Sequence, residues 1–410
     1  MNKLPLITAA LMAAGLVSAN AQTVVRLTGS TAYRANVNAA LHAGTGIFDA
    51  PPSNLGPAYA AGANQLVFSG NISGNPVIVK TSFTGSEAGI ASLVNVAVPN
   101  NVSGQPAANL PGTPQPSFLA NDGSAGPDVS SPDISMADTS QAVSLTQDSR
   151  VHDVGIVGVV QFVWMKGKNS GQANWAHLSN VTIPQINVLL SGGKQDLSFF
   201  TGNGADFGSP IVAVGRNKGS GTRVNTLVQA LYGVGKAVQQ YAVTPTYTAG
   251  VLNTAVSTTP INDGAIVNIG NDGFDSGKGV AQTLLMTAGG GSLTTIPIGY
   301  LGLGDANSVQ ALLNDGTANA AAPANGQYLT VNGVLYSDAA INNGTYDHWG
   351  HEHILTGPFT SATGTTVANR LKSAMPATAL GGSTGLPYAL NVTLFADRPA
   401  GGDTGFVTPL

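Results

Sequence analysis

Three segments of this chain share one order: a short apolar stretch, then a Gly-Ser pair, then a pattern typical of a helix. The pairs are Gly29-Ser30, Gly85-Ser86 and Gly219-Ser220. A short run of β-branched apolar residues favours a buried strand, so each segment predicts a strand that leads directly into a helix. Strands that alternate with helices predict an α/β fold with parallel strand pairing.

Helical spacing follows each of the three pairs. Apolar residues recur three and four positions apart after the first and third pairs, and a shorter pattern follows the second. These residues are Tyr33, Val37, Ala40 and Leu41, then Ala88, Ile90, Ala91, Leu93 and Val94, then Val224, Leu227, Val228 and Leu231. Two further apolar runs, 154–165 and 296–303, predict buried strands. The α/β prediction therefore extends over most of the chain.

A helix that begins at a Gly-Ser pair is suited to binding an anion. The first backbone N–H groups of a helix have no partner inside it, and the helix dipole favours negative charge there. Glycine lets the backbone approach a ligand closely, and serine adds a hydroxyl donor. Because ligands of α/β proteins bind at the carboxyl ends of strands, the three pairs could converge on one small oxyanion.

The first 21 residues have the three parts of a secretory signal peptide. Lys3 supplies the charge, residues 4–17 are apolar, and Ala19-Asn20-Ala21 is a cleavage site of small residues. We therefore expect an exported, soluble chain that begins at Gln22 after cleavage. No other apolar window is long enough to span a bilayer, so membrane insertion is not expected.

The chain contains no cysteine and few charged residues. It therefore has no disulfide, no thiol nucleophile and no cysteine for lipid attachment, which fits a bacterial periplasm, with the cell surface or the extracellular space as alternatives. The formal net charge is −4 and no basic run occurs. Nucleic acid and anionic membrane surfaces are thus poor candidates for partners.

Five motifs occur in one order along residues 23–305. They are Gly29-Ser30-Thr31, Thr84 to Gly89, Ile134 to Asp138, Arg216 to Thr222 and Ile298 to Gly302. In this order they resemble the motifs of periplasmic phosphate-binding proteins, the solute receptors of phosphate ABC transporters. Each motif alone has little specificity, and the shared order carries the resemblance.

The resemblance implies an α/β chain with the two-lobed type II periplasmic binding protein fold, in which a two-stranded hinge joins lobes that close over the ligand. One lobe would comprise residues 22–150 together with 306–410, and the other residues 151–305. The implied role is delivery of phosphate, or a similar tetrahedral oxyanion, to the permease of an ABC transporter. Such a receptor is not an enzyme and needs no cofactor.

The resemblance also implies a ligand cage built from both lobes. The positions that match are Ser30, Thr31, Ser86, Asp138, Arg216, Ser220, Gly221 and Thr222. Asp138 would accept a hydrogen bond from the protonated oxygen of hydrogen phosphate, whereas sulfate has no such proton and would be repelled. Arg216 would hold two ligand oxygens with its forked guanidinium group.

Simpler interpretations stay open at these positions. Ser30 and Asp138 are residue types that cap helices without any ligand. Glu87 stands where the family usually has a small residue, and Lys218 stands where many members have an aspartate that pairs with the arginine. These two departures leave a different ligand, or none, as alternatives.

A second cluster of chemically active residues lies between Tyr346 and His353. Its three histidines, His348, His351 and His353, are common ligands of zinc, copper and nickel. The spacing matches no known zinc motif, and on a strand His351 and His353 would share one face. A packing and surface role is the simpler interpretation, and no bound metal is expected.

Two other classes of function remain as alternatives. Low charge and long polar loops fit a cell-surface or extracellular structural protein that keeps this fold without binding an anion. A metal-dependent, phosphatase-like enzyme that uses residues 348–353 is the other. Residues 273–279 resemble a Walker loop, but their spacing is wrong for one, so glycine-rich turns explain them better.

Overall fold

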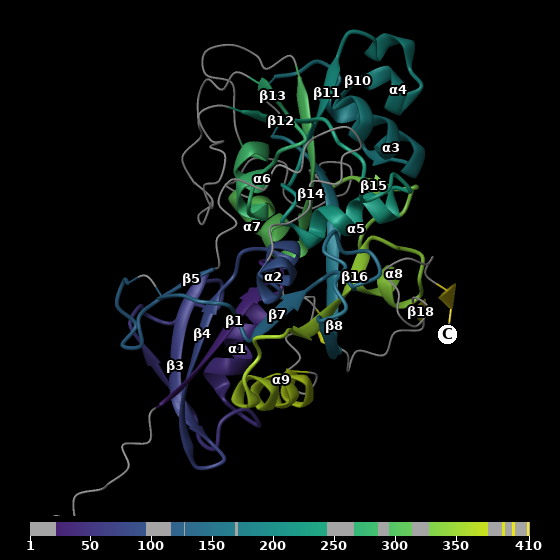
Figure 1. Cartoon of the computed structure of the whole chain (residues 1–410). Helices are drawn as coiled ribbons and strands as arrows, with labels where there is room; N and C mark the ends of the chain where they lie inside the picture. Colours follow the sequence, from purple (N-terminus) through teal and green to yellow (C-terminus); the bar gives the residue numbers. More distant parts are fainter. Residues whose placement is uncertain are drawn as a thin grey trace, which may run out of the picture.

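A computed structural model describes residues 22–95, 116–126, 128–168, 171–243, 266–285, 295–313 and 328–375, with three short strands after them. The predicted signal peptide lies outside the described residues. The dominant feature is one mixed sheet with the strand order β10-β11-β14-β8-β16-β7-β1-β4-β3-β2, and β17 (Tyr388–Ala389) pairs with β8 beside this path. Figure 1 shows this sheet running through two halves of the molecule, with helices packed around it.

The first half contains the first two of the predicted strand–helix units. Its strands are β1 (Thr23–Gly29), β2 (Ser53–Leu55), β3 (Gln65–Ile72), β4 (Asn75–Ser82), β5 (Ser117–Phe118), β6 (Asp128–Val129) and β7 (Ile134–Ala137). Its helices are α1 (Arg34–Ala43), α2 (Ser86–Leu93) and α9 (Ala362–Ala374). Strand β1 pairs in parallel with both β4 and β7, which brings the ends of all three strands to one edge.

The second half contains the third unit. Its strands are β9 (Asn180–Val181), β10 (Lys194–Asp196), β11 (Pro210–Val214), β12 (Gln240–Val243), β13 (Ile266–Gly270), β14 (Ile296–Gly302) and β15 (Thr330–Val331). Its helices are α3 (Ile183–Gly192), α4 (Leu197–Thr201), α5 (Gly221–Gln229), α6 (Gly277–Leu284), α7 (Leu303–Leu313) and α8 (Asp338–Asn342). Strands β11 and β14 are parallel, so the third Gly-Ser unit also ends at the carboxyl edge of a parallel pair.

Two long antiparallel strands, β8 (His152–Lys166) and β16 (Trp349–Thr356), join the halves. Residues 152–161 of β8 pair with β16, whereas residues 162–166 pair with β14 of the second half. Strand β16 continues into the first half, where it pairs with β7. The apolar run predicted as one buried strand is therefore the element that connects the two halves.

Each half has its own apolar core. The largest cluster of the first half packs β1, β3, β4, α1 and α9 around Leu27, Phe68 and Leu371. The largest cluster of the second half packs α3, β11 and β14, and it also takes in Ile341 and Trp349 from the C-terminal part of the chain. Because the main cores are separate, the halves are connected mainly through the strands between them.

The helices follow the predicted patterns with two exceptions. Helix α2 begins at Ser86 and α5 at Gly221, at their Gly-Ser pairs, whereas α1 begins only at Arg34, after a turn over residues 31–33. Val224 and Leu227 are buried as their spacing predicts. The prediction that Leu231 continues the apolar face of the third helix is wrong. That residue lies two positions beyond the end of α5, has a positive φ of 52° and is 64% exposed.

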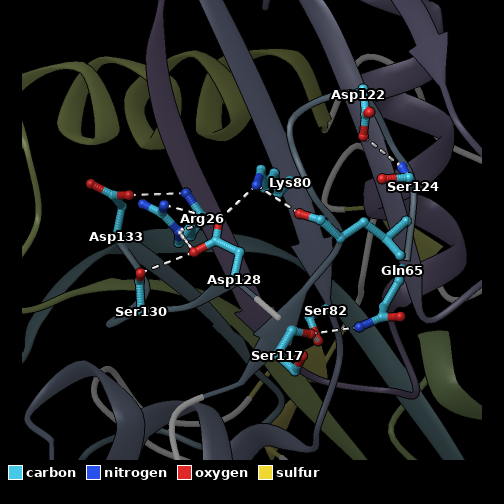
Figure 2. A network of polar contacts seen from close by, with 11 residues as sticks. Arg26, Gln65, Lys80, Ser82, Ser117, Asp122, Ser124, Asp128, Ser130 and Asp133 are labelled. Atoms are coloured by element: carbon cyan, nitrogen blue, oxygen red, sulfur yellow. Dashed lines mark hydrogen bonds and ion pairs between the residues drawn. The ribbon is translucent and has the colours of Figure 1, made fainter. Parts of the chain in front are cut away.

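A charged network fastens residues 117–133 to the first half (Figure 2). The carboxylate of Asp128 lies 2.6 Å from the Nζ atom of Lys80 and 3.0 Å from the Nη2 atom of Arg26. Lys80 is almost fully buried, and its ammonium group also donates to the carbonyl of Leu119 at 2.6 Å. A buried ammonium group needs such partners because desolvation of an unpaired charge is costly. The network therefore fixes the segment that leads into β7 and the site beyond it.

Among the described residues, none of the helices is long and apolar enough to cross a membrane.

Candidate functional site

The predicted cage residues meet where the two halves face each other. The Ser86 hydroxyl, at the start of α2, donates to Asp138 Oδ1 at 2.5 Å, and the backbone N–H of Asp138 donates to Ser86 Oγ at 3.2 Å. Asp138 directly follows β7, as the predicted strand ending in an aspartate requires. Strands β4 and β7, which lie on either side of β1, thus place a hydroxyl and a carboxylate in contact.

The second half reaches the same carboxylate through α5. The Thr222 hydroxyl lies 3.5 Å from Asp138 Oδ2, and the amide of Asn225 donates to the backbone carbonyl of Asp138 at 2.5 Å. Helix α5 can come this close only because position 221 is glycine. A Cβ atom on Gly221 would lie 1.6 Å from Asp138 Oδ1. The glycine is therefore a steric requirement of the contact between the halves.

Arg216 is buried beside this contact and bonded on several sides. Its Nε atom donates to the Phe274 carbonyl at 3.0 Å, and its Nη2 atom donates to the Asp275 carbonyl at 2.8 Å and to Thr31 Oγ1 at 3.3 Å. The last of these bonds links the second half to the turn before α1. Burial lowers the pKa of Arg216, while Asp305 and nearby Asp138 oppose that shift.

Backbone carbonyl groups hold Arg216 in place of the carboxylate that the resemblance implies at position 218. Many members of the resembling family have an aspartate there, and the sequence suggested that Arg216 would be held less rigidly without it. Here the backbone of residues 274–275 supplies the acceptors instead. This segment belongs to the glycine-rich run, residues 273–279, that resembled a Walker loop. The absence of an aspartate at position 218 was the one sign in the sequence that another element must hold Arg216.

Two polar side chains that the sequence did not single out fix the Arg216 backbone. The Tyr300 hydroxyl accepts from the Arg216 N–H at 3.1 Å and donates to Gln240 Oε1 at 3.1 Å. The amide of Gln240 in turn donates to the Arg216 carbonyl at 3.1 Å. Tyr300 lies in the motif that suggested the resemblance, so its role could have been sought, whereas Gln240 lies in a segment without any recognisable motif.

Ser220 caps a helix, whereas Ser30 does not. Ser220 Oγ accepts from the Arg223 N–H of α5 at 3.3 Å. Ser30 Oγ accepts from the Tyr33 N–H at 3.2 Å, within the turn that precedes α1, and α1 has no side-chain cap. The capping interpretation that the sequence left open therefore applies neither to Ser30 nor to Asp138, which is followed by turns and not by a helix.

The N-terminus of α2 is bonded to the third Gly-Ser loop. The Gly219 carbonyl accepts from the N–H groups of Glu87 and Ala88, at 3.0 and 3.2 Å. Gly85, which precedes the helix, has a φ of 109°, and a Cβ atom there would lie 2.4 Å from the same carbonyl oxygen. An oxygen atom thus sits on the helix N-terminus, which is the chemistry that the sequence predicted, but it belongs to the protein.

Glu87 points away from the cage into the first half. Its carboxylate accepts from the hydroxyls of Thr139 and Ser144 and from the N–H of Leu145, at 2.7 to 2.9 Å. Burial raises the pKa of Glu87 to about 7, although these three bonds favour the ionised form. The carboxylate of Glu87 thus ties the loop after Asp138 to α2.

The histidine segment forms strand β16 and the residues just before it, and its three histidines are buried. His348 Nε2 accepts from Trp164 Nε1 at 3.0 Å, and His353 Nδ1 lies 2.8 Å from Asp153 Oδ2. His351 and His353 share a face, with ring centroids 6.2 Å apart. Within the described parts of the chain, no group of three or more histidine, cysteine, aspartate or glutamate side chains is placed to hold a metal ion. Packing, without a surface role, accounts for these residues.

Comparison with known proteins finds similarity only among solved structures. No family model and no curated sequence matches the chain. A protein from Clostridium perfringens, assigned as a phosphate ABC transporter substrate-binding protein and solved with bound phosphate, is 15% identical over 90% of this chain and 100% of its own, with a TM-score of 0.43. An ABC-type phosphate transport receptor from Vibrio cholerae is 13% identical over 86% of this chain and 95% of its own, with a TM-score of 0.39. PstS from Borrelia burgdorferi is 14% identical over 85% and 92%, with a TM-score of 0.36.

Similarity this distant adds nothing to the argument, so the class of the fold rests on the topology of the chain itself. Parallel strands in each half end in Gly-Ser loops that face each other, and two antiparallel strands connect the halves. This arrangement is a mixed α/β architecture of two halves joined by two strands, as the sequence predicted.

Proposed function

We propose that this protein is an exported solute-binding protein that captures phosphate, or a similar tetrahedral oxyanion, between two lobes and delivers it to an ABC transporter permease. One observation carries the proposal: the two halves bring Ser86, Asp138, Arg216 and Thr222 into one buried polar cluster. No step of this function changes a covalent bond, and none needs a cofactor.

The chemistry of the cluster suits hydrogen phosphate. Asp138 is an acceptor that a protonated ligand oxygen can satisfy, whereas a fully deprotonated oxyanion would meet the carboxylate without a shared proton. Arg216 donates from Nε and Nη2 to the protein, which leaves its Nη1 atom to donate to phosphate oxygens. Ser86 and Thr222 already bond to Asp138, so their hydroxyls can turn from the carboxylate to a ligand.

Ligand binding also needs the N-terminus of α2. The Gly219 carbonyl holds the N–H groups of Glu87 and Ala88, and we propose that a phosphate oxygen takes this place when the ligand binds. A modest opening of the two lobes about β8 and β16 would release the carbonyl. The bound ligand then stabilises the closed arrangement of the lobes, because in that arrangement it forms hydrogen bonds to both of them, as expected for a two-lobed receptor.

The lobes and the location belong to the same proposal. The proposed lobes are residues 22–150 with 306–410, and residues 151–305, although helix α7 and the stretch from Leu329 to Trp349 pack in cores of the second half. The predicted signal peptide over residues 1–21 would direct the protein to the periplasm.

Isothermal titration of the mature protein, freed of phosphate, tests this function. We expect tight binding of phosphate and none of sulfate. Asp138→Ala should abolish binding, and Arg216→Lys should weaken it by about 10- to 100-fold, because lysine keeps the charge but not the fork. Arg150→Lys, in an exposed pair with Asp148, is the matched control and should leave the affinity unchanged.

One observation favours a second candidate, a cell-surface or extracellular structural protein without a ligand. The Gly219 carbonyl and the carboxylate of Asp138 already satisfy donors of the cage. In that case neither anion gives heat in the titration, and the same contacts serve only to hold the two halves together.

A further inference from the structure

Arg34 carries a buried guanidinium group that is incompletely bonded. It is the first residue of α1, and its side chain is only 5% exposed. Its Nη1 atom has no hydrogen-bond partner among the described residues. A buried charged donor without an acceptor is costly, because it has lost water and gained nothing in exchange.

A second buried arginine, Arg223, provides a comparison because both of its terminal nitrogens have hydrogen-bond acceptors. Arg223 donates from Nη1 to the carbonyls of Arg216 and Asn271, and from Nη2 to the Asn271 side chain, at 2.5 to 3.1 Å. That guanidinium group has acceptors on both of its terminal nitrogens and serves to brace the Arg216 loop. Arg34 therefore differs from a structural arginine of the same protein.

Arg34 is close in sequence to Thr31, a residue of the predicted cage. Thr31, three positions earlier, accepts the hydrogen bond from Arg216 Nη2 at 3.3 Å. The pKa of Arg34 is lowered by burial, and Asp305 at the start of α7 opposes that shift for Arg34 as it does for Arg216. Asp305 therefore acts electrostatically on both arginines, and Lys278 of α6 also interacts with Arg34 and Asp305.

We infer that Arg34 is a second arginine of the oxyanion site, which donates from Nη1 to a ligand oxygen on the side of the first half. The inference rests on the proposed function and adds to it a residue that no motif indicated. With one guanidinium group from each half, the bound oxyanion bonds to both lobes, which favours the closed arrangement.

The test is titration of phosphate into Arg34→Met and Asp305→Asn, with Arg370→Met as the matched control. Arg370 lies on α9 and bonds to Asp49 and Ser73, away from the cage. We expect Arg34→Met to weaken phosphate binding by about 10- to 100-fold, as loss of a charged hydrogen bond does. Asp305→Asn should keep or raise the affinity because it removes negative charge near both arginines. Arg370→Met should change nothing.

Thermal unfolding without phosphate separates a ligand-binding role from a structural one. Removal of an unsatisfied buried charge should leave the midpoint of Arg34→Met unchanged or raise it. The inference would be wrong if Arg34→Met lowered the unfolding midpoint and if Asp305→Asn weakened phosphate binding as much as Arg34→Met does. Those two results would mean that Arg34 acts only as an ion pair with Asp305.

The same titrations distinguish a failure of this inference from a failure of the proposed function. Unchanged phosphate affinity in Arg34→Met, with normal binding by the wild type, overturns this inference and leaves the proposed function standing. Failure of the wild type to bind phosphate overturns both.

Discussion

Arg216 shows how much the setting of one residue depends on parts of the chain that are distant in sequence. The motif around it predicted an anion-binding arginine, and the structure holds this residue at the contact between the halves. Its anchors, the carbonyls of Phe274 and Asp275, are backbone atoms of a loop almost sixty residues away. Every residue has a backbone carbonyl, so no sequence motif could have identified these two acceptors.

Glu87 makes a pH-dependent contribution to stability. Below its ordinary pKa of 4.5, the side chain is protonated in both the folded and the unfolded state. Between pH 4.5 and about 7 the unfolded state ionises while burial keeps the folded state protonated. The free energy of unfolding should therefore fall as pH rises through this window, by about 3 kcal/mol in total, and level off above it.

Urea unfolding at a series of pH values measures this effect. Glu87→Gln should lose the decline between pH 4.5 and 7, because the amide does not titrate. Asp122→Asn is the control, since hydrogen bonds to Ser124 lower the pKa of Asp122 and place its titration below that window. An equal decline in the wild type and in Glu87→Gln would show that Glu87 ionises normally in the folded protein.

At the scale of elements, the contact between β7 and α5 depends on the missing side chain at position 221. We expect Gly221→Ala to force Asp138 and α5 apart, although alanine is the better helix former. The free energy of unfolding should fall by about 1–3 kcal/mol, as for other overpacked sites, and phosphate affinity should fall with it. Gly204→Ala, where a Cβ atom would meet nothing within 4 Å, is the control. Equal stability of the two variants would contradict the close approach.

The Asp128 network offers a second prediction about an element. Asp128→Asn leaves the buried ammonium group of Lys80 without its carboxylate and should cost about 3 kcal/mol in the free energy of unfolding. Adding Lys80→Met removes the stranded charge, so the double variant should recover part of that loss. Strictly additive losses in urea unfolding would show that the two side chains are not coupled.

The elements were largely predictable because burial leaves a periodic pattern in the sequence. The strand–helix units, the long apolar strand and the strand at 296–302 follow it closely. Leu231 fits the helical period but lies past the end of α5. Spacing alone does not say where a helix ends, and Gly233, two residues on, was the available sign of a turn.

For the whole molecule, the sequence predicted two lobes and a two-stranded connection only through the resemblance. The continuous sheet through β8 and β16 is a long-range pairing that no local pattern reveals. The bond from the Gly219 carbonyl to α2 is likewise a contact between distant segments. The proposed function therefore requires a ligand oxygen to displace this protein oxygen from the N-terminus of α2.

The most direct test of this account is a crystal structure of the mature protein grown with arsenate, a tetrahedral oxyanion whose arsenic atom can be located by anomalous scattering. The account predicts one strong arsenic peak between the halves, bonded to Ser86, Asp138, Arg216 and Thr222, with the Gly219 carbonyl displaced from α2. No peak at this place, with the Gly219 carbonyl still bonded to Glu87 and Ala88, would contradict it.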